Sequence, residues 1–215
     1  MIIRNLVLTL FLIFIQTNAV AKSIDDGEVE LTEKQLRTLQ SLNDPQYKEL
    51  NVLQSQQPRK SIRLKVTKLE DNSGQVYLAA IVSRAELSPY LTKLEQLLDD
   101  EFQIYRAFQA ARDHQLFHMT LLSPQEYQVA DQALVEKLLT PSFNSSFSSQ
   151  LNVTLLGLGK VEQGNKQTFF VVAQSDDAQL IRQRFLLKNK DFHVTLGFNP
   201  NDIYGVKKDI STLIH

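Results

Sequence analysis

Two short segments of the sequence carry the same residue types in the same order. Phe117–Leu121 reads FHMTL and Phe192–Leu196 reads FHVTL, so each places a threonine two residues after a histidine. Because side chains alternate along a strand, the histidine and threonine of each segment share one face and the apolar residues share the other. The chain has only four histidines. Two of them in matching frames indicate duplicated supersecondary units.

Two imidazoles that face one site suit the hydrolysis of a phosphodiester. One neutral histidine accepts a proton from water, and the other, as imidazolium, protonates the departing oxygen. Hydroxyl groups that point the same way can hydrogen-bond the non-bridging phosphate oxygens. We therefore expect His118 and His193 to be catalytic and Thr120 and Thr195 to bind substrate. Which histidine is the acid stays open, and no carboxylate cluster accompanies them, so this chemistry requires no metal.

Alternating and apolar runs predict the strands that would carry these residues. We predict six of them, over residues 61–67, 75–82, 116–122, 151–158, 167–174 and 191–198. The residues Asp71–Gly74 predict a turn that joins the first two strands in a hairpin.

Helix-start signals separate several of these strands. Ser88-Pro89 predicts the start of the longest amphipathic helix, which runs to about Arg112. Ser123-Pro124 predicts a helix to about Leu139, and Asp176 caps one to about Leu187. Hairpins mixed with strand–helix units predict an α+β fold with antiparallel sheet.

The N-terminal residues predict an export signal. Arg4 precedes the apolar stretch Leu6–Ile15, and Ala19–Ala21 supplies small residues at signal-peptidase spacing. We expect residues 1–21 to be a cleavable signal peptide, so the mature chain would be secreted or periplasmic; an uncleaved anchor is the alternative. Residues 22–60 are predicted to be a helical or partly ordered lead-in, and residues 61–215 one domain.

The composition excludes several classes of protein. The 215 residues include Lys+Arg 23 against Asp+Glu 24, a net charge of -1, and no cysteine. Disulfides, thiol nucleophiles and cysteine metal sites are therefore impossible. A near-neutral chain of this kind is not expected to coat duplex nucleic acid, nor to bind a membrane once the signal is removed.

The paired motifs resemble those of the two-histidine (2H) phosphoesterases, which include bacterial RNA cyclic phosphodiesterases and the Swiss Army Knife RNA repair-like branch. The resemblance covers about Arg63 to Val206, and the tail Asp202–Val206 is similar to the segment after the second motif in that branch. It implies a bilobed α+β fold in which two pseudo-symmetric antiparallel sheets form a concave cleft, with helices on the outside. It also implies cleavage of 2′,3′-cyclic phosphates or related 2′-linked nucleotides without metal or cofactor.

The expected partner is a nucleotide or short RNA with a cyclic or 2′-linked phosphate. Export is unexpected for intracellular RNA repair, so nucleotide scavenging or RNA processing outside the cytosol fits better. Tyr204 is a candidate for stacking on a base or contacting phosphate at the rim of the cleft. Basic residues near loops are weaker candidates for attracting phosphate: Arg84, Lys160, Lys188 and Lys190.

Two other functions stay open. A non-catalytic nucleotide- or phosphate-binding module would use the same cleft without turnover, and a histidine-based metal hydrolase is a third possibility. His114 lies four residues before His118, but we expect His118 to belong to a strand and the helix to end near Arg112, so the two do not share a helix face.

Overall fold

The computed structural model describes residues 59–140 and 149–214. The predicted signal peptide, nearly all of the lead-in at residues 22–60 and the connector at residues 141–148 lie outside the described residues. Within the described part of the chain, no helix is long and apolar enough to cross a membrane.

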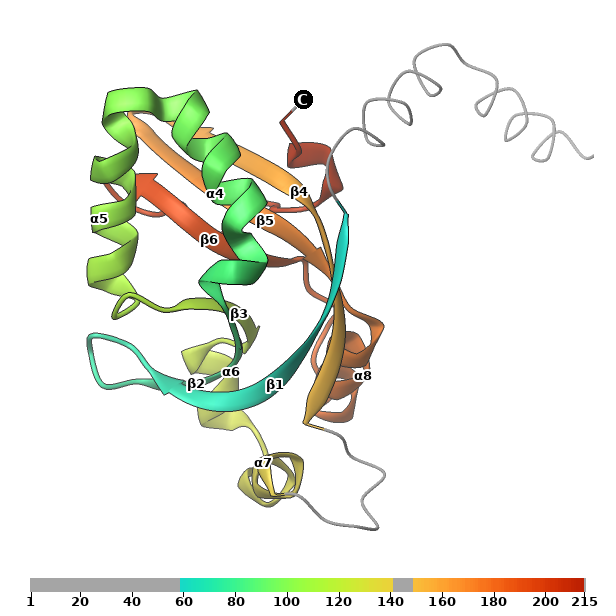
Figure 1. The fold of residues 1–215 in the computed structure, drawn as a ribbon. Coiled ribbons are helices and arrows are strands. Elements are labelled where there is room, and N and C mark those ends of the chain that lie inside the picture. Colours follow the sequence, from blue (N-terminus) through green and yellow to red (C-terminus); the bar gives the residue numbers. More distant parts are fainter. Residues whose placement is uncertain (1–58, 141–148, 215) are drawn as a thin grey trace, which may run out of the picture. The chain divides into compact units, whose positions relative to one another are not determined.

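Six antiparallel strands form one closed barrel in the order β1-β2-β3-β6-β5-β4. Their bounds are β1 Lys60–Glu70, β2 Val76–Val82, β3 Phe117–Leu122, β4 Gln150–Gln163, β5 Lys166–Gln174 and β6 Phe192–Asn199. All six predicted strands are confirmed, as is the mixed fold with antiparallel pairing (Figure 1). The strands close into a single ring, because β1 also pairs with β4 from Lys60↔Leu155 to Lys65↔Gln150.

The predicted first helix is two helices with an earlier start. These are α4 Arg84–Leu98 and α5 Phe102–Arg112, joined by the 3-10 turn η2 Asp99–Glu101. The predicted start at Ser88-Pro89 is wrong, because the hydroxyl of Ser83 accepts the Glu86 N–H and caps the helix one turn earlier. Pro89 therefore lies inside α4. Asp99 adopts φ 45, which ends α4.

The second predicted helix is also divided. Ser123 caps α6 Pro124–Val129 as predicted, in a capping box with Glu126, while Asp131 caps a separate helix, α7 Gln132–Leu139. α8 Asp176–Arg184 is capped by Ser175 rather than by Asp176, and it ends before the predicted Leu187. A final 3-10 turn, η3, covers Ile210–Thr212.

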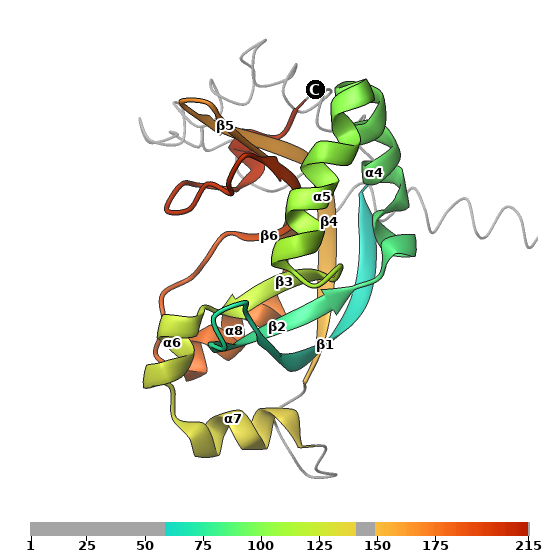
Figure 2. The ribbon, with the colours of Figure 1, turned by 90° about the vertical axis from the view of Figure 1, so that its left-hand side faces the viewer.

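Each strand presents one apolar face to the helices. α4 and α5 lie side by side (Figures 1 and 2), α5 packs against β6, α6 against β2, and α8 against β3 and β4. The main core joins these helices to strand residues such as Val66, Ala80, Met119, Val171 and Val194. We call the opposite face of the strands the motif face. It is defined by the cross-strand partners Thr67, Ala79, Ile81, His118, Thr120, Phe170, Val172, His193 and Thr195.

Candidate active site

Strands β3 and β6 place the two histidine motifs next to each other. Met119 pairs with Val194 in antiparallel register, and both are 0% exposed on the helix-side face. Neighbouring residues step in opposite directions in such a pair, so His118 lies opposite Thr195 and Thr120 lies opposite His193. The two histidines are then diagonal neighbours, with Cα atoms about 7–8 Å apart. The structure thus brings together the four residues that the sequence singles out.

His118 is partly buried beside an unpredicted tyrosine of β2. The Tyr77 hydroxyl lies 3.4 Å from His118 Nε2, and the two ring centroids are 5.4 Å apart. Burial lowers the pKa of His118, Arg112 lowers it further, and the Asp113 carboxylate opposes the shift. Burial also raises the pKa of Tyr77 to about 12, so its phenol keeps its proton at neutral pH.

His193 lies in more cationic surroundings. The edge of Phe170 packs on its ring at a centroid distance of 5.6 Å. Burial, followed by the positive charges of Lys208 and Lys190, lowers the pKa of His193 to about 3, although Asp202 opposes the shift. His193 is therefore neutral near pH 7, where it can accept a proton.

Nδ1 of each motif histidine is buried and makes no hydrogen bond of normal geometry, although a backbone group of Asp191 interacts with His193 and raises its pKa. Among the described residues, three buried side-chain atoms lack a hydrogen bond of normal geometry: His118 Nδ1, His193 Nδ1 and Glu86 Oε2. Glu86 Oε2 lies 2.5 Å from Lys60 Nζ in an ion pair. Because a buried unsatisfied polar group costs about 1–3 kcal/mol, native folds keep few of them. The coincidence of two with the repeated motifs favours a functional site here.

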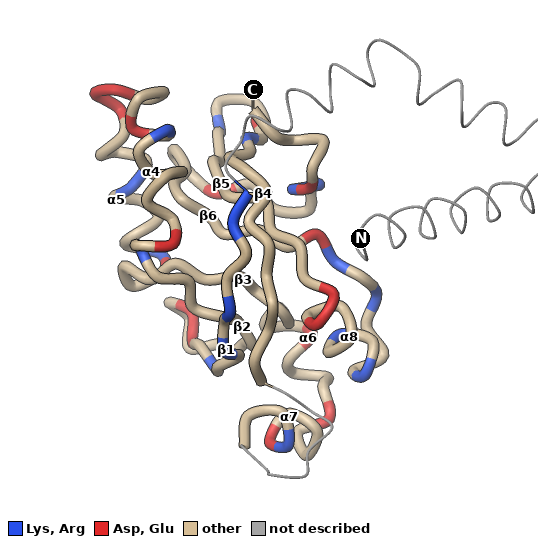
Figure 3. Tube along the Cα trace, turned by 45° about the vertical axis from the view of Figure 1, so that its right-hand side comes forward, with Lys and Arg blue, Asp and Glu red and all other residues tan. Residues whose placement is uncertain are grey.

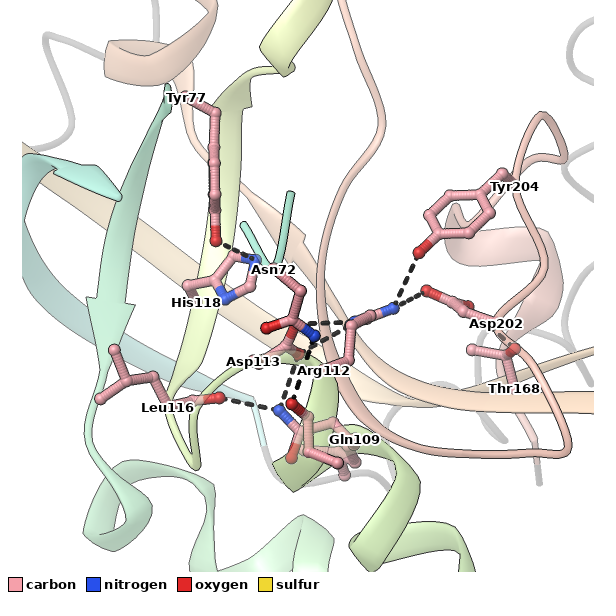
Figure 4. Close-up of polar contacts among 12 residues, drawn as sticks. Asn72, Tyr77, Gln109, Arg112, Asp113, Leu116, His118, Thr168, Asp202 and Tyr204 are labelled. Atoms are coloured by element: carbon pink, nitrogen blue, oxygen red, sulfur yellow. Dashed lines mark hydrogen bonds and ion pairs between the residues drawn. The ribbon is translucent and has the colours of Figure 1, made fainter. Parts of the chain in front are cut away.

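A network of charged groups fixes the C-terminal segment beside the motifs (Figure 4). Arg112, at the end of α5, donates to both oxygens of Asp113 at 2.6 and 2.7 Å and forms an ion pair with Asp202. Asp202 Oδ1 also accepts from Thr168 Oγ1 at 2.9 Å and from Lys208 Nζ at 3.1 Å. Burial would raise the pKa of Asp202, but Lys208 and Arg112 hold it below its usual value.

Sequence reasoning missed Tyr77, Arg112, Asp202 and Lys208. Arg112 and Asp202 are 90 positions apart, so no local sequence pattern predicts their contact. The available signal was weak, because Asp202 and Lys208 are ordinary charged residues in a short tail after the second motif.

Tyr204 lies at this network and is exposed. Its side chain is 72% exposed, Arg112 Nη1 donates to its hydroxyl at 3.3 Å, and Lys208 Nζ lies 5.9 Å from its ring centroid. The predicted position at the rim of the site is thus compatible with the structure, while its role in binding stays a prediction.

The basic candidates have different surroundings. Lys190 is partly buried, and the side-chain amide of Gln179 hydrogen-bonds both its backbone N–H and its carbonyl group. The positive charge of Lys190 lowers the pKa of His193. Lys160 pairs with Glu162 at 2.5 Å. Arg84 is the first residue of α4, and Lys188 accepts a hydrogen bond from Arg182 through its carbonyl group. In the part of the chain that the structure describes, no group of three His, Cys, Asp or Glu residues is placed to hold a metal ion.

Comparison with known proteins identifies the family. The model of the Swiss Army Knife, 2H phosphoesterase domain matches residues 86–204, which include both motifs, Arg112, Asp202 and Tyr204. No curated protein and no solved structure matches the chain. The family match covers more than half of the chain and both strands on which the paired histidines lie. The chain therefore belongs to the 2H phosphoesterase superfamily, in its Swiss Army Knife branch.

Proposed function

We propose that this protein is a metal-independent phosphodiesterase that hydrolyses 2′,3′-cyclic phosphates or related 2′-linked nucleotides. Membership of the 2H family supports phosphodiesterase-type activity in general. The observation that carries the finer proposal is the β3–β6 register, in which each histidine lies opposite the threonine of the other motif. A phosphorus atom above the side chains of these two histidines and two threonines would have an imidazole on each side and hydroxyl groups that can bind its non-bridging oxygens.

The charges around the two rings favour a division of labour. The positive charges of Lys208 and Lys190 favour the neutral, proton-accepting form of His193, whereas Asp113 favours the protonated form of His118, so we assign His193 as the base and His118 as the acid. In the proposed reaction, neutral His193 takes a proton from water as its oxygen bonds to phosphorus. The bond to the 2′ or 3′ ribose oxygen breaks, and His118 imidazolium gives that oxygen its proton. Thr120 and Thr195 donate to the non-bridging oxygens, on which negative charge increases.

The test is hydrolysis of the four 2′,3′-cyclic mononucleotides, with the position of the product phosphate read by phosphorus NMR. His118→Asn and His193→Asn should each lower kcat about 10²–10⁴-fold. His114→Asn is the matched control, because His114 is exposed in the turn after α5 and its φ of 51 suits asparagine. Activity should be unchanged in chelator. Full activity in the double variant would reject the assignment.

The binding module remains the second candidate, since it needs the same polar face. Calorimetry with a cyclic mononucleotide separates the two functions: heat of binding with the ligand recovered intact supports a binder, and product formation supports an enzyme. Metal-dependent hydrolysis predicts loss of activity in chelator and its return with one added metal.

For the location of the protein, we propose export through residues 1–21, on the sequence pattern alone. N-terminal sequencing of the protein recovered from outside the cytosol should begin at Lys22. A chain that keeps Met1 and remains in the cytosol would contradict this proposal.

A further inference from the structure

Strand β1 carries basic residues on both faces, and the two faces differ in pairing. Lys60 and Lys68 form ion pairs with Glu86 at 2.5 Å and with Glu136 at 2.6 Å, carboxylates that belong to α4 and α7. Arg63 and Lys65 lie between them and are exposed. Within the described residues, neither of these two forms an ion pair. Figure 3 shows basic positions spaced along β1.

The register places Arg63 and Lys65 on the motif face. Thr67 pairs with Ala79, and Ala79 pairs with Thr120, so these three side chains share that face. Alternation along β1 puts residues 63 and 65 on the same side as Thr67. The β1–β2 ladder ends at Val66↔Ala80, and Lys65, the next residue of β1, pairs with Gln150 of β4.

This position is close enough to extend the site. Neighbouring strands are about 4.8 Å apart, so the backbone of Thr67 lies about 10 Å from that of Thr120, two strands away. Lys65 and Arg63 lie two and four residues from Thr67 along β1, on the same face. Ile81 of β2, also on this face, is uncharged and 41% exposed. The carboxylate on the other side is Asp177, which accepts hydrogen bonds from the backbone and side-chain N–H groups of Asn152, the partner of Arg63, at 2.7 and 2.8 Å.

We propose that Arg63 and Lys65 bind the backbone phosphates of a single-stranded oligonucleotide whose cyclic or 2′-linked phosphate lies between His118 and His193. The preferred substrate is then an oligonucleotide rather than a mononucleotide, an inference that rests on the proposed function. Proteins that hold single strands follow the backbone with cations. Arg63 and Lys65, which form no ion pair with any residue that the structure describes, provide such a path on the motif face, although the net charge of the chain is only -1.

The experiment compares two substrates in two charge-matched variants. The substrates are a 2′,3′-cyclic mononucleotide and an eight-nucleotide RNA that ends in a 2′,3′-cyclic phosphate. The double variant Arg63→Gln, Lys65→Gln should have a higher KM for the RNA and an unchanged KM for the mononucleotide. The double variant Lys60→Gln, Lys68→Gln loses the same charge from the helix-side face, and its KM for both substrates should be unchanged. Equal kinetics of the two double variants on the RNA would overturn the proposal.

Binding without turnover separates this inference from the proposed function. In a His118→Asn, His193→Asn background, the fluorescence anisotropy of the labelled RNA is followed from 50 to 200 mM salt. Loss of two phosphate contacts should lower the slope of log K against log salt by about 1.4, which is about sevenfold over this range. A reduced slope without hydrolysis by the wild-type protein would support RNA binding by Arg63 and Lys65 and reject the enzymatic function. Hydrolysis with an unchanged slope would do the reverse.

Discussion

Two copies of one motif acquire different properties from the side chains around them. His118 has the Tyr77 hydroxyl at 3.4 Å and the negative charge of Asp113 nearby, whereas His193 has the apolar edge of Phe170 and the positive charge of Lys208. Because acid and base need different protonation states at one pH, unequal surroundings suit the pair better than equal ones.

Tyr77 orients His118, and its removal should affect turnover more than binding. Tyr77→Phe deletes the hydroxyl near His118 Nε2. The imidazole then loses a hydrogen bond that contributes about 1 kcal/mol to its orientation, so kcat should fall about fivefold. KM should change less. Tyr90→Phe is the matched control, because the buried Tyr90 hydroxyl donates at the same 3.4 Å to the Leu155 carbonyl group, within the helix-side core. Equal kinetic effects of the two changes would indicate general loosening of the fold instead of positioning.

Lys208 and Asp202 should move the titration of His193 in opposite directions. Lys208→Gln removes a positive charge, so the pKa of His193 rises and the acidic limb of kcat/KM moves to higher pH. Asp202→Asn removes a negative charge, so the same limb moves to lower pH. Proton NMR titration of the His193 ring measures the shift without substrate. If the pKa of His193 moved in the same direction in both variants, changes in packing rather than in charge would control it.

At the scale of elements, β6 is held by β5 and by α5. β5 pairs with it from Gln167↔Asn199 to Ala173↔Phe192, β3 pairs with it at Val194, and α5 packs against it further along the strand. A side chain at Gly197 would bring its Cβ to 3.0 Å from Tyr105 Cβ and 3.1 Å from the Tyr105 backbone. The bare backbone of Gly197 thus lets α5 lie directly on the strand that carries His193.

Gly197→Ala should therefore strain the contact between α5 and β6. We expect the free energy of unfolding to fall by about 1–3 kcal/mol, as for other overpacked sites, since the near atoms are mainly backbone and cannot rotate away. Denaturant unfolding followed by circular dichroism measures this loss. Ala178→Gly, which removes rather than adds a methyl group at a buried site in α8, controls for a general response to core mutation. An unchanged midpoint for Gly197→Ala would show that the helix shifts freely.

The sequence predicted the elements better than their boundaries or partners. The repeated frames at His118 and His193 and the alternating or apolar runs of the six strands were readable because strand patterns are local. The start of α4 was not, because Ser83 and the Ser88-Pro89 pair both carry helix-start signals. The β1–β4 pairing that closes the ring and the Asp202 network join residues distant in the chain, so they depend on tertiary packing.

At the scale of the whole molecule, the site histidines connect stability to pH. Burial lowers the pKa of both below the ordinary value of 6.5, so the folded state binds fewer protons than the unfolded state in mildly acidic solution. Their contribution to stability is complete above about pH 6.5 and is lost as the pH falls toward the pKa of each folded group. Asp202 shifts below its ordinary 3.8, so its contribution is lost only in stronger acid.

Chemical unfolding at pH 7 and pH 4.5 should therefore identify the histidines as the source of acid sensitivity. Each proton of difference changes the free energy of unfolding by about 1.4 kcal/mol per pH unit, so His193 can account for up to about 2–3 kcal/mol across this interval. His193→Asn should flatten the dependence by that amount, and His118→Asn should flatten it in the same direction. His114→Asn, at an exposed site, should keep the wild-type slope. If all three variants lost as much stability as the wild type between the two pH values, the lowered pKa values of the buried site histidines would be wrong, and with them the choice of His193 as the base.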